Sequence, residues 1–382
     1  MTIYINQNLN VAGNITGDWI TFGDGAGDYV QAGGDITQDV ISFGSGAGDF
    51  VLSRSGNISN DIIVFGNGVG GDSVVTNGNI NNDAISFGNG DFDYVSANSI
   101  ISNDVLTFGN GTEDRVDTEG GVSNSIINFG SGPNDGVSAG YYMNDSVNGN
   151  YITFHDRAGT TAGDSVVATT GIGNNSIAFG NGGGDNVTDH GTGATLTNNT
   201  INFGNGNDDY VMVAGPSGYN KITLGNGQND SVTLGPNVTN QGGDYIATGT
   251  GAGDSVIVGP HTTADTFAFA LGTGASAYTT ISGNPYTSGN SAQIRDQIAV
   301  NGGQLGNTLV NVNTVSPGDT MATFISHDVG TPIAGHTYIG NNGIDTFIYT
   351  DTQTGQKGAI EVVGVFGGSI ENHVLTLLAT AA

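Results

Sequence analysis

Residues 87–95, FGNGDFDYV, join an aromatic residue, two glycines, an aspartate and a β-branched residue, and close variants recur along the chain. The variants follow one another every 21 to 25 residues. Their anchor positions are Phe22, Phe43, Phe65, Phe87, Phe108, Phe129, Phe154, Phe179, Phe203, Leu224 and Thr248. A period of this length indicates a solenoid, in which each repeat is one coil that buries its apolar side chains only against neighbouring coils.

One repeat divides into two short strands separated by turns. Residues 18–22, DWITF, alternate polar and apolar side chains, as a half-buried strand does. Residues 23–27, GDGAG, favour a turn because glycine tolerates positive φ, and residues 28–30, DYV, begin a second strand. The spacing therefore predicts an all-β fold, a parallel β-solenoid of about eleven two-sided, β-roll-like coils. Its inward side chains are those of the type Ile20, Phe22 and Val30.

The repeat ends before the chain does. The predicted array covers residues 1–258, whereas residues 259–382 lose the period and hold only eight of the 35 acidic residues. Strand-like runs in this part predict a small β-rich C-terminal domain. We expect it to cap the array and to contribute to assembly, because the open end of a solenoid exposes a strand edge.

Aspartate recurs twice in each repeat, so stacking the coils would align two columns of carboxylates. The first column consists of Asp28, Asp49, Asp72, Asp93, Asp114, Asp135, Asp164, Asp185, Asp209, Asp230 and Asp254. The second column begins with Asp18, Asp39, Asp61, Asp83 and Asp104, continues with Ser125, Asn150, Asn175, Asn199 and Asn220, and returns to acid at Asp244. We refer to these two sets as the first column and the second column.

A column of carboxylates needs neutralisation. Like charges about 5 Å apart repel by roughly 3 kcal/mol per pair at an effective dielectric near 20. Multiple Ca²⁺ ions would remove this repulsion, because Ca²⁺ accepts carboxylate and carbonyl oxygens in flexible geometry. We therefore expect all the aspartates of the first column to bind calcium, and the second column to do so where it is acidic. The alternative is that the aspartates only accept hydrogen bonds within their own turns, without a cation.

Composition excludes several classes of partner. The net charge of −29 makes nucleic acid an unsuitable ligand and cations a suitable one. We expect no membrane insertion, because no apolar run approaches the length that spans a bilayer. Without cysteine the chain has neither disulfides nor thiolate metal sites. The sequence also predicts no enzyme: residues 136–140, GVSAG, match a nucleophile motif but occupy a repeat position that turns its valine inward.

The repeat resembles the glycine-rich nonapeptide G-G-x-G-x-D-x-U-x of RTX (repeats-in-toxin) proteins. Residues 87–95 carry one extra residue between the second glycine and the aspartate, and the coils are longer than those of the family. Residues 264–269 and 342–349 resemble the segments that close RTX arrays. The resemblance implies a calcium-binding β-roll, secretion by a type I system, and an uncleaved export signal at the C-terminus, here residues 374–382.

These patterns together predict an extracellular structural protein of the bacterial cell surface. We expect calcium-dependent self-assembly into a surface layer, a filament or a matrix, with other copies of the chain as partners. The first alternative is a calcium-dependent adhesin that binds a glycan, such as a cell-surface polysaccharide, or another surface. The second is a secreted hydrolase.

Overall fold

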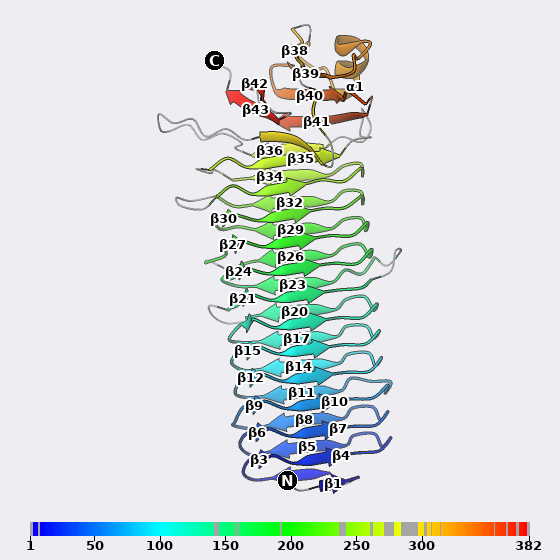
Figure 1. Cartoon of the computed structure of the whole chain (residues 1–382), viewed down its shortest axis with the longest axis vertical. Coiled ribbons are helices and arrows are strands. Elements are labelled where there is room, and N and C mark those ends of the chain that lie inside the picture. The colour runs from blue at the N-terminus through cyan, green and yellow to red at the C-terminus, as the bar shows by residue number, and fades with distance from the viewer. Residues whose placement is uncertain are drawn as a thin grey trace. The chain divides into compact units, whose positions relative to one another are not determined.

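The computed structural model confirms the all-β fold, and its coils, about 11 over residues 9–282, are those of a parallel β-solenoid. The structure describes residues 3–6, 8–140, 145–156, 159, 161–191, 193–236, 242–259, 263–270, 279–283, 297–301, 304–306, 308–313, 315–354, 356–363, 366–371 and 374–379. The chain divides into two compact units, Met1–Thr195 and Leu196–Ala382. Within each unit the coils follow one another in chain order (Figure 1).

Each complete coil of the first unit contributes one strand to each of three parallel sheets, A, B and C. Sheet A contains β1 (Ile3–Ile5), β4 (Trp19–Thr21), β7 (Val40–Ser42), β10 (Ile62–Val64), β13 (Ala84–Ser86), β16 (Val105–Thr107), β19 (Ile126–Asn128), β22 (Tyr151–Thr153) and β25 (Ser176–Ala178). Sheet B contains β2 (Leu9–Val11), β5 (Tyr29–Ala32), β8 (Phe50–Ser53), β11 (Ser73–Thr76), β14 (Tyr94–Ala97), β17 (Arg115–Thr118), β20 (Gly136–Ala139), β23 (Ser165–Ala168) and β26 (Asn186–Asp189). Sheet C contains β3 (Ile15–Thr16), β6 (Ile36–Thr37), β9 (Ile58–Ser59), β12 (Ile80–Asn81), β15 (Ile101–Ser102), β18 (Val122–Ser123), β21 (Ser146–Asn148) and β24 (Gly171–Gly173).

Sheet C is the part of the coil that the two-strand interpretation of the repeat did not predict. Its strands are only two or three residues long and come from the polar stretch that ends each repeat. Each carries one inward apolar residue, such as Ile36, Ile58 or Ile80, and all three of these are fully buried. The coil is therefore three-sided, because a single inward isoleucine is enough to anchor a third strand.

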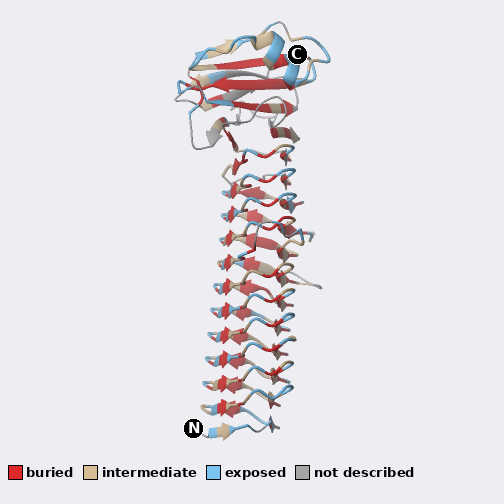
Figure 2. Ribbon diagram, turned by 90° about the vertical axis from the view of Figure 1, so that its right-hand side faces the viewer, coloured by how far each residue is buried: buried red, intermediate tan, exposed pale blue. Residues whose placement is uncertain are grey.

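The core is a set of straight side-chain ladders. Ile20, Phe22 and Val30 are at most 4% exposed, and their counterparts in the following coils at most 7%, which confirms the predicted inward set. The phenylalanine rings of sheet A stack face to face, with centroids 4.7 Å apart from Phe22 to Phe43 and 5.0 Å apart from Phe154 to Phe179. Figure 2 shows the buried residues lying along the strands of successive coils. This stacking fixes the register, because a slip of one residue would expose the apolar ladder.

The second unit continues the coil pattern and then changes to longer strands. Its coil strands are β27 (Leu196–Thr197), β28 (Thr200–Asn202), β29 (Tyr210–Val213), β30 (Ser217–Gly218), β31 (Lys221–Thr223), β32 (Ser231–Leu234), β33 (Tyr245–Ala247), β34 (Ser255–Val258), β35 (Thr266–Ala270), β36 (Thr279–Gly283) and β37 (Gln297–Asn301). Strands β35 and β36 still pair in parallel with β33 and β34, so these ladders run past residue 258, the end of the predicted array.

The remaining elements form the β-rich C-terminal region. They are β38 (Thr308–Asn311), helix α1 (Met321–Thr323), the π-helical segment η1 (Phe324–Val329), β39 (His336–Asn341), β40 (Asp345–Asp351), β41 (Lys357–Val363), β42 (Phe366–Glu371) and β43 (Val374–Ala379). Here β39, β40 and β41 pair antiparallel, and Phe324 packs in a small core with Phe347 and Tyr349. The same region joins the ladders directly, because β41 pairs with β36 and β43 pairs with β37.

Candidate cation-binding columns

The aspartates of the first column are linked from coil to coil by a repeated hydrogen bond. The backbone N–H of each aspartate donates to carboxylate Oδ1 of the aspartate in the next coil. The N–H of Asp93, for example, lies 2.9 Å from Oδ1 of Asp114, and the N–H of Asp114 lies 2.9 Å from Oδ1 of Asp135. In the second unit Asp209 donates to Asp230 at 3.1 Å, and Asp230 to Asp254 at 3.3 Å. The predicted alignment of these side chains is thus confirmed within each unit.

The second carboxylate oxygen sets most of the first column apart from Asp39, Asp61 and Asp83 of the second column. Seven of its buried aspartates present an Oδ2 atom that has no hydrogen-bond partner, namely Asp49, Asp93, Asp114, Asp135, Asp164, Asp230 and Asp254. These side chains are at most 1% exposed, so water does not solvate the oxygen either. A buried acceptor without a partner destabilises the folded state, and binding of a proton or a cation would relieve this cost.

Burial also changes the proton affinity of these groups. It raises the pKa of Asp93 to about 8, a rise that the Asp72 amide opposes and the charge of Asp114 reinforces. Burial likewise raises the pKa of Asp135 to about 9 and that of Asp230 to about 8. In the absence of a cation, several aspartates of the first column therefore hold a proton near neutral pH.

The second column has the same ladder but uses both carboxylate oxygens. Oδ1 of Asp83 accepts the N–H of Asp61 at 2.7 Å, and its Oδ2 accepts the N–H of Asn81 at 3.0 Å. Asp39 and Asp61 have the same pair of bonds. Neutral residues continue the ladder, since Oδ1 of Asn150 accepts the N–H of Ser125 at 2.9 Å. Hydrogen bonding therefore accounts for both oxygens of Asp39, Asp61 and Asp83, whereas Oδ2 of Asp104 has no partner. Calcium binding in the second column stays a prediction.

Glycine brings the turn backbone close to the first column. A Cβ on Gly111 would lie 1.6 Å from the carbonyl oxygen of Gly90 in the preceding coil and 3.2 Å from Oδ1 of Asp114. A Cβ on Gly46 would meet the Gly25 carbonyl oxygen at 1.8 Å and Oδ2 of Asp49 at 3.0 Å. Any larger residue would push the coils apart and press on the carboxylate, which explains the recurring G-x-G.

The first column supplies some of the oxygen ligands that a calcium ion needs. The oxygens without partners are hard donors of the type Ca²⁺ prefers, and they repeat from coil to coil. Each regular coil, however, already commits one carboxylate oxygen to a backbone N–H, so an ion there would have to share oxygens from successive coils. The first column could hold cations between coils, with the aspartates as ligands and with charge neutralisation as the chemistry that they supply.

One further acidic residue joins the first column, and sequence reasoning missed it. Asp156 lies in the longest turn of the first unit, and its carboxylate approaches those of Asp164 and Asp185. Asp156 stands two residues after Phe154, where other coils carry an exposed asparagine such as Asn89 or Asn110. The available signal was the lengthened turn, with Asp164 ten residues after Phe154 instead of the six that separate Phe129 from Asp135.

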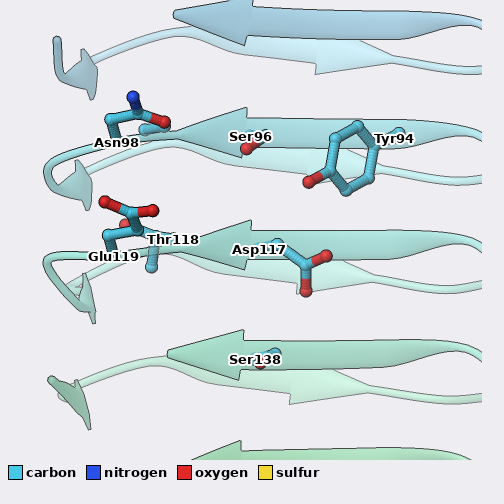
Figure 3. A pocket seen from close by; sticks show the side chains of 8 residues that line it. Tyr94, Ser96, Asn98, Asp117, Thr118, Glu119 and Ser138 are labelled. Atoms are coloured by element: carbon cyan, nitrogen blue, oxygen red, sulfur yellow. The ribbon is translucent and has the colours of Figure 1, made fainter. Parts of the chain in front are cut away.

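A shallow hollow lies on the outer face of sheet B, away from both columns. It measures about 290 Å³ and is lined by Tyr94, Ser96, Ala97, Asn98, Asp117, Thr118, Glu119 and Ser138. Figure 3 shows these residues on three neighbouring strands, with the Tyr94 ring at one end and the Glu119 carboxylate at the other. The small Ser96 and Ser138 side chains leave the space between larger residues. An aromatic ring beside amide and carboxylate groups suits a polar ligand with an apolar face.

Comparison of the chain with models of known protein families and with curated protein sequences finds no match. Among the described residues no helix has the length and apolar character that crossing a membrane requires.

Proposed function

We propose that the protein is a secreted structural component that assembles with copies of itself in the presence of calcium, at the cell surface or in an extracellular matrix. The observation that carries self-association is an uncharged, apolar stripe on the outer face of sheet A. The carboxylate columns and the RTX-like repeat support the calcium dependence and the extracellular location. We propose no catalytic activity.

The stripe consists of outward side chains that stand in register on seven successive strands. Strand pairing places them directly above one another, in the order Trp19, Val40, Ile62, Ala84, Val105, Ile126 and Tyr151. The large members are substantially exposed, with Trp19 and Ile62 at 49% and Tyr151 at 65%. At the strand spacing of about 4.8 Å the stripe extends for roughly 30 Å. An exposed apolar strip of this length on a soluble protein indicates a contact surface.

The residues around the stripe favour a second copy of the chain as the occupant. The other outward column of these strands is Thr21, Ser42, Val64, Ser86, Thr107, Asn128 and Thr153, so neither column carries a charge. Two chains of net charge −29 could therefore meet on this face without opposing carboxylates across the contact. A second copy also repeats the same 4.8 Å spacing, which lets side chains interdigitate strand by strand.

Calcium would favour assembly by reducing the net negative charge of each chain. Neutralising the carboxylate columns lowers the long-range repulsion between copies, so association through the stripe should require the divalent ion or high salt. Many weak stripe contacts then reinforce one another in a sheet or filament.

The test is to place charge on the stripe. We expect Ile62→Glu combined with Ile126→Glu to leave the fold intact and to abolish assembly in millimolar Ca²⁺, because carboxylates would face each other across the contact. Light scattering and electron microscopy measure assembly, and circular dichroism verifies folding. Val75→Glu, an outward position on sheet B, is the matched control and should assemble normally. Wild-type protein that stays monomeric in calcium, or a stripe variant that still assembles, would contradict the proposal.

A second candidate function rests on the hollow of sheet B. Its Tyr94 ring and the Asp117 and Glu119 carboxylates could hold a sugar ring, which would make the protein an adhesin for a surface polysaccharide. Burial raises the pKa of Asp117, while the charge of Arg115 and a hydrogen bond from Tyr94 lower it, so this side chain is held in place by its neighbours. Glycan-array binding that Tyr94→Ala abolishes and Tyr29→Ala retains would favour this function.

A further inference from the structure

Three buried carboxylates converge at one point of the first unit. The metal-ligating oxygens of Asp156, Asp164 and Asp185 all lie within 4.8 Å of one another. The three side chains are at most 4% exposed. The first column otherwise contributes one aspartate per coil. Here Asp156 adds a third carboxylate beside those of two successive coils.

The lengthened turn explains how Asp156 arrives there. The backbone of this turn follows the ladder up to Asp156, because His155 N–H donates to the Gly130 carbonyl and Asn181 N–H to the Asp156 carbonyl, both at 3.1 Å. Asp164 then follows four residues later than it would after a standard turn. Exposed asparagine and serine side chains bridge this turn position in the preceding coils, whereas Asp156 is buried.

The hydrogen bonds of Asp164 leave a ligand atom free. Its Oδ1 accepts the N–H of Asp135 at 2.8 Å, and its own N–H donates to Oδ1 of Asp185 at 2.9 Å. Its Oδ2 is buried and has no hydrogen-bond partner, and the side chain is fully enclosed. A buried carboxylate that has an oxygen without a partner and lies close to two other buried carboxylates is unstable unless a cation or a proton binds there.

We propose that Asp156, Asp164 and Asp185 form a discrete Ca²⁺ site that binds the ion more tightly than the regular coils do. The donors are all carboxylate oxygens, which excludes a preference for zinc or copper. Oxygens held at 2.3–2.6 Å from one calcium ion can lie up to about 4.6–5.2 Å apart, so the three oxygens can share one ion.

The carboxylates themselves provide the reason for a cation at this point. Three buried carboxylates whose oxygens lie within 4.8 Å of one another repel one another, and a divalent ion between them removes that repulsion. Arg157 follows Asp156 directly in the sequence but lies outside the described residues. The experiment therefore includes an Arg157 variant, because an arginine could neutralise these carboxylates in place of calcium.

The inference rests on the calcium binding of the proposed function and is independent of assembly. The experiment titrates CaCl₂ by calorimetry into dilute full-length protein that carries the two stripe substitutions and stays monomeric. We expect the tightest binding step to weaken by about 10-fold or more in Asp156→Asn, since affinity follows the number of charged ligands. Asp93→Asn, the same change in a regular coil, should leave that step unchanged, as should Arg157→Gln.

A second variant guards against misfolding of the point mutant. Replacing residues 155–163 with Gly-Asn-Gly-Gly-Gly, the turn that follows Phe179, restores a standard coil and removes Asp156. We expect it to fold, to keep the first column and to lose the tight step. An isotherm that is the same in wild type and both variants would overturn the site, as would a markedly tighter calcium step in Arg157→Gln, because the arginine would then be the native counter-ion. Asp156→Asn protein without the stripe substitutions that still assembles with calcium would sustain the site and limit the proposed function to the other aspartates.

Discussion

The two carboxylate columns of the first unit share one hydrogen-bond ladder but differ in the partner of the second carboxylate oxygen. In both, each backbone N–H donates to the side chain one coil further on, as Asp93 does to Asp114 and Asp61 to Asp83. In the second column the remaining oxygen of Asp39, Asp61 and Asp83 accepts an N–H from its own coil, although that of Asp104 does not. In the first column the corresponding oxygen of five buried aspartates of this unit, Asp49, Asp93, Asp114, Asp135 and Asp164, has no partner.

The difference explains which residues each column contains. A ladder that needs only an acceptor can use serine or asparagine, and the second column changes to Ser125, Asn150 and Asn175 without losing its hydrogen bonds. The first column is aspartate in every coil, although asparagine would serve the same N–H. Hydrogen bonding therefore does not account for the acid of the first column, whereas the proposed cation binding would.

The largest expected effect is that of pH on metal-free protein, because it acts on all buried aspartates together. Burial raises the folded-state pKa of Asp93 to about 8 and of Asp83 to about 7, from an ordinary 3.8. The folded state then binds more protons than the unfolded state above pH 4, so stability is fully present below about pH 4 and falls as pH rises toward 8. Urea midpoints measured in a chelator should decrease steadily over this range.

Calcium at pH 8 separates the columns in that experiment. It should restore the midpoint by replacing the lost protons of the first column. Asp93→Asn with Asp114→Asn should reduce this restoration, whereas Asp61→Asn with Asp83→Asn should not. A chelated protein whose midpoint is flat or rises with pH would refute the pKa argument, and equal effects of the two double variants would remove the distinction between the columns.

Replacing one aspartate with alanine should have the next largest effect on stability. In the calcium experiment the first column matters more, whereas here the second-column variant should lose more stability. Asp83→Ala strands two backbone donors, those of Asp61 and Asn81, whereas Asp93→Ala strands only that of Asp72. Each buried N–H without an acceptor costs about 1–3 kcal/mol, so in chelator at pH 7 we expect losses of about 2–6 and about 1–3 kcal/mol respectively. Urea unfolding measures both, and a larger loss for Asp93→Ala would show that the first column does more than the hydrogen bonds indicate.

The smallest effect is expected from a single asparagine in the second column. Asp83→Asn keeps an Oδ1 acceptor, as Asn150 does, and the Asn150 side-chain amide finds the Val122 carbonyl at 3.0 Å. Only the Asn81 N–H loses its Oδ2 acceptor, so we expect the free energy of unfolding to fall by about 1 kcal/mol, equally with calcium and with chelator. A calcium-dependent loss in this variant would assign cations to the second column as well.

Much of the fold could be predicted because the repeat restates it in every coil. The alternation in residues 18–22 and the glycines after them predicted stacked strands, and the inward ladders of Ile20, Phe22 and Val30 are confirmed. The third strand was missed because a single isoleucine such as Ile58 gives too short a pattern to separate a strand from a loop. Its neighbours in the stack, not its own sequence, make it a strand.

The sequence by itself determined the period, the three recurring residue types and the alignment of acids, since identical coils can stack only in register. Only the tertiary structure decided which carboxylate oxygens are satisfied, that Asp156 joins Asp164 and Asp185, and that seven outward residues from Trp19 to Tyr151 form one stripe. Those properties depend on how side chains from different coils lie against one another, and a linear period records spacing along the chain, not the partner that each atom meets.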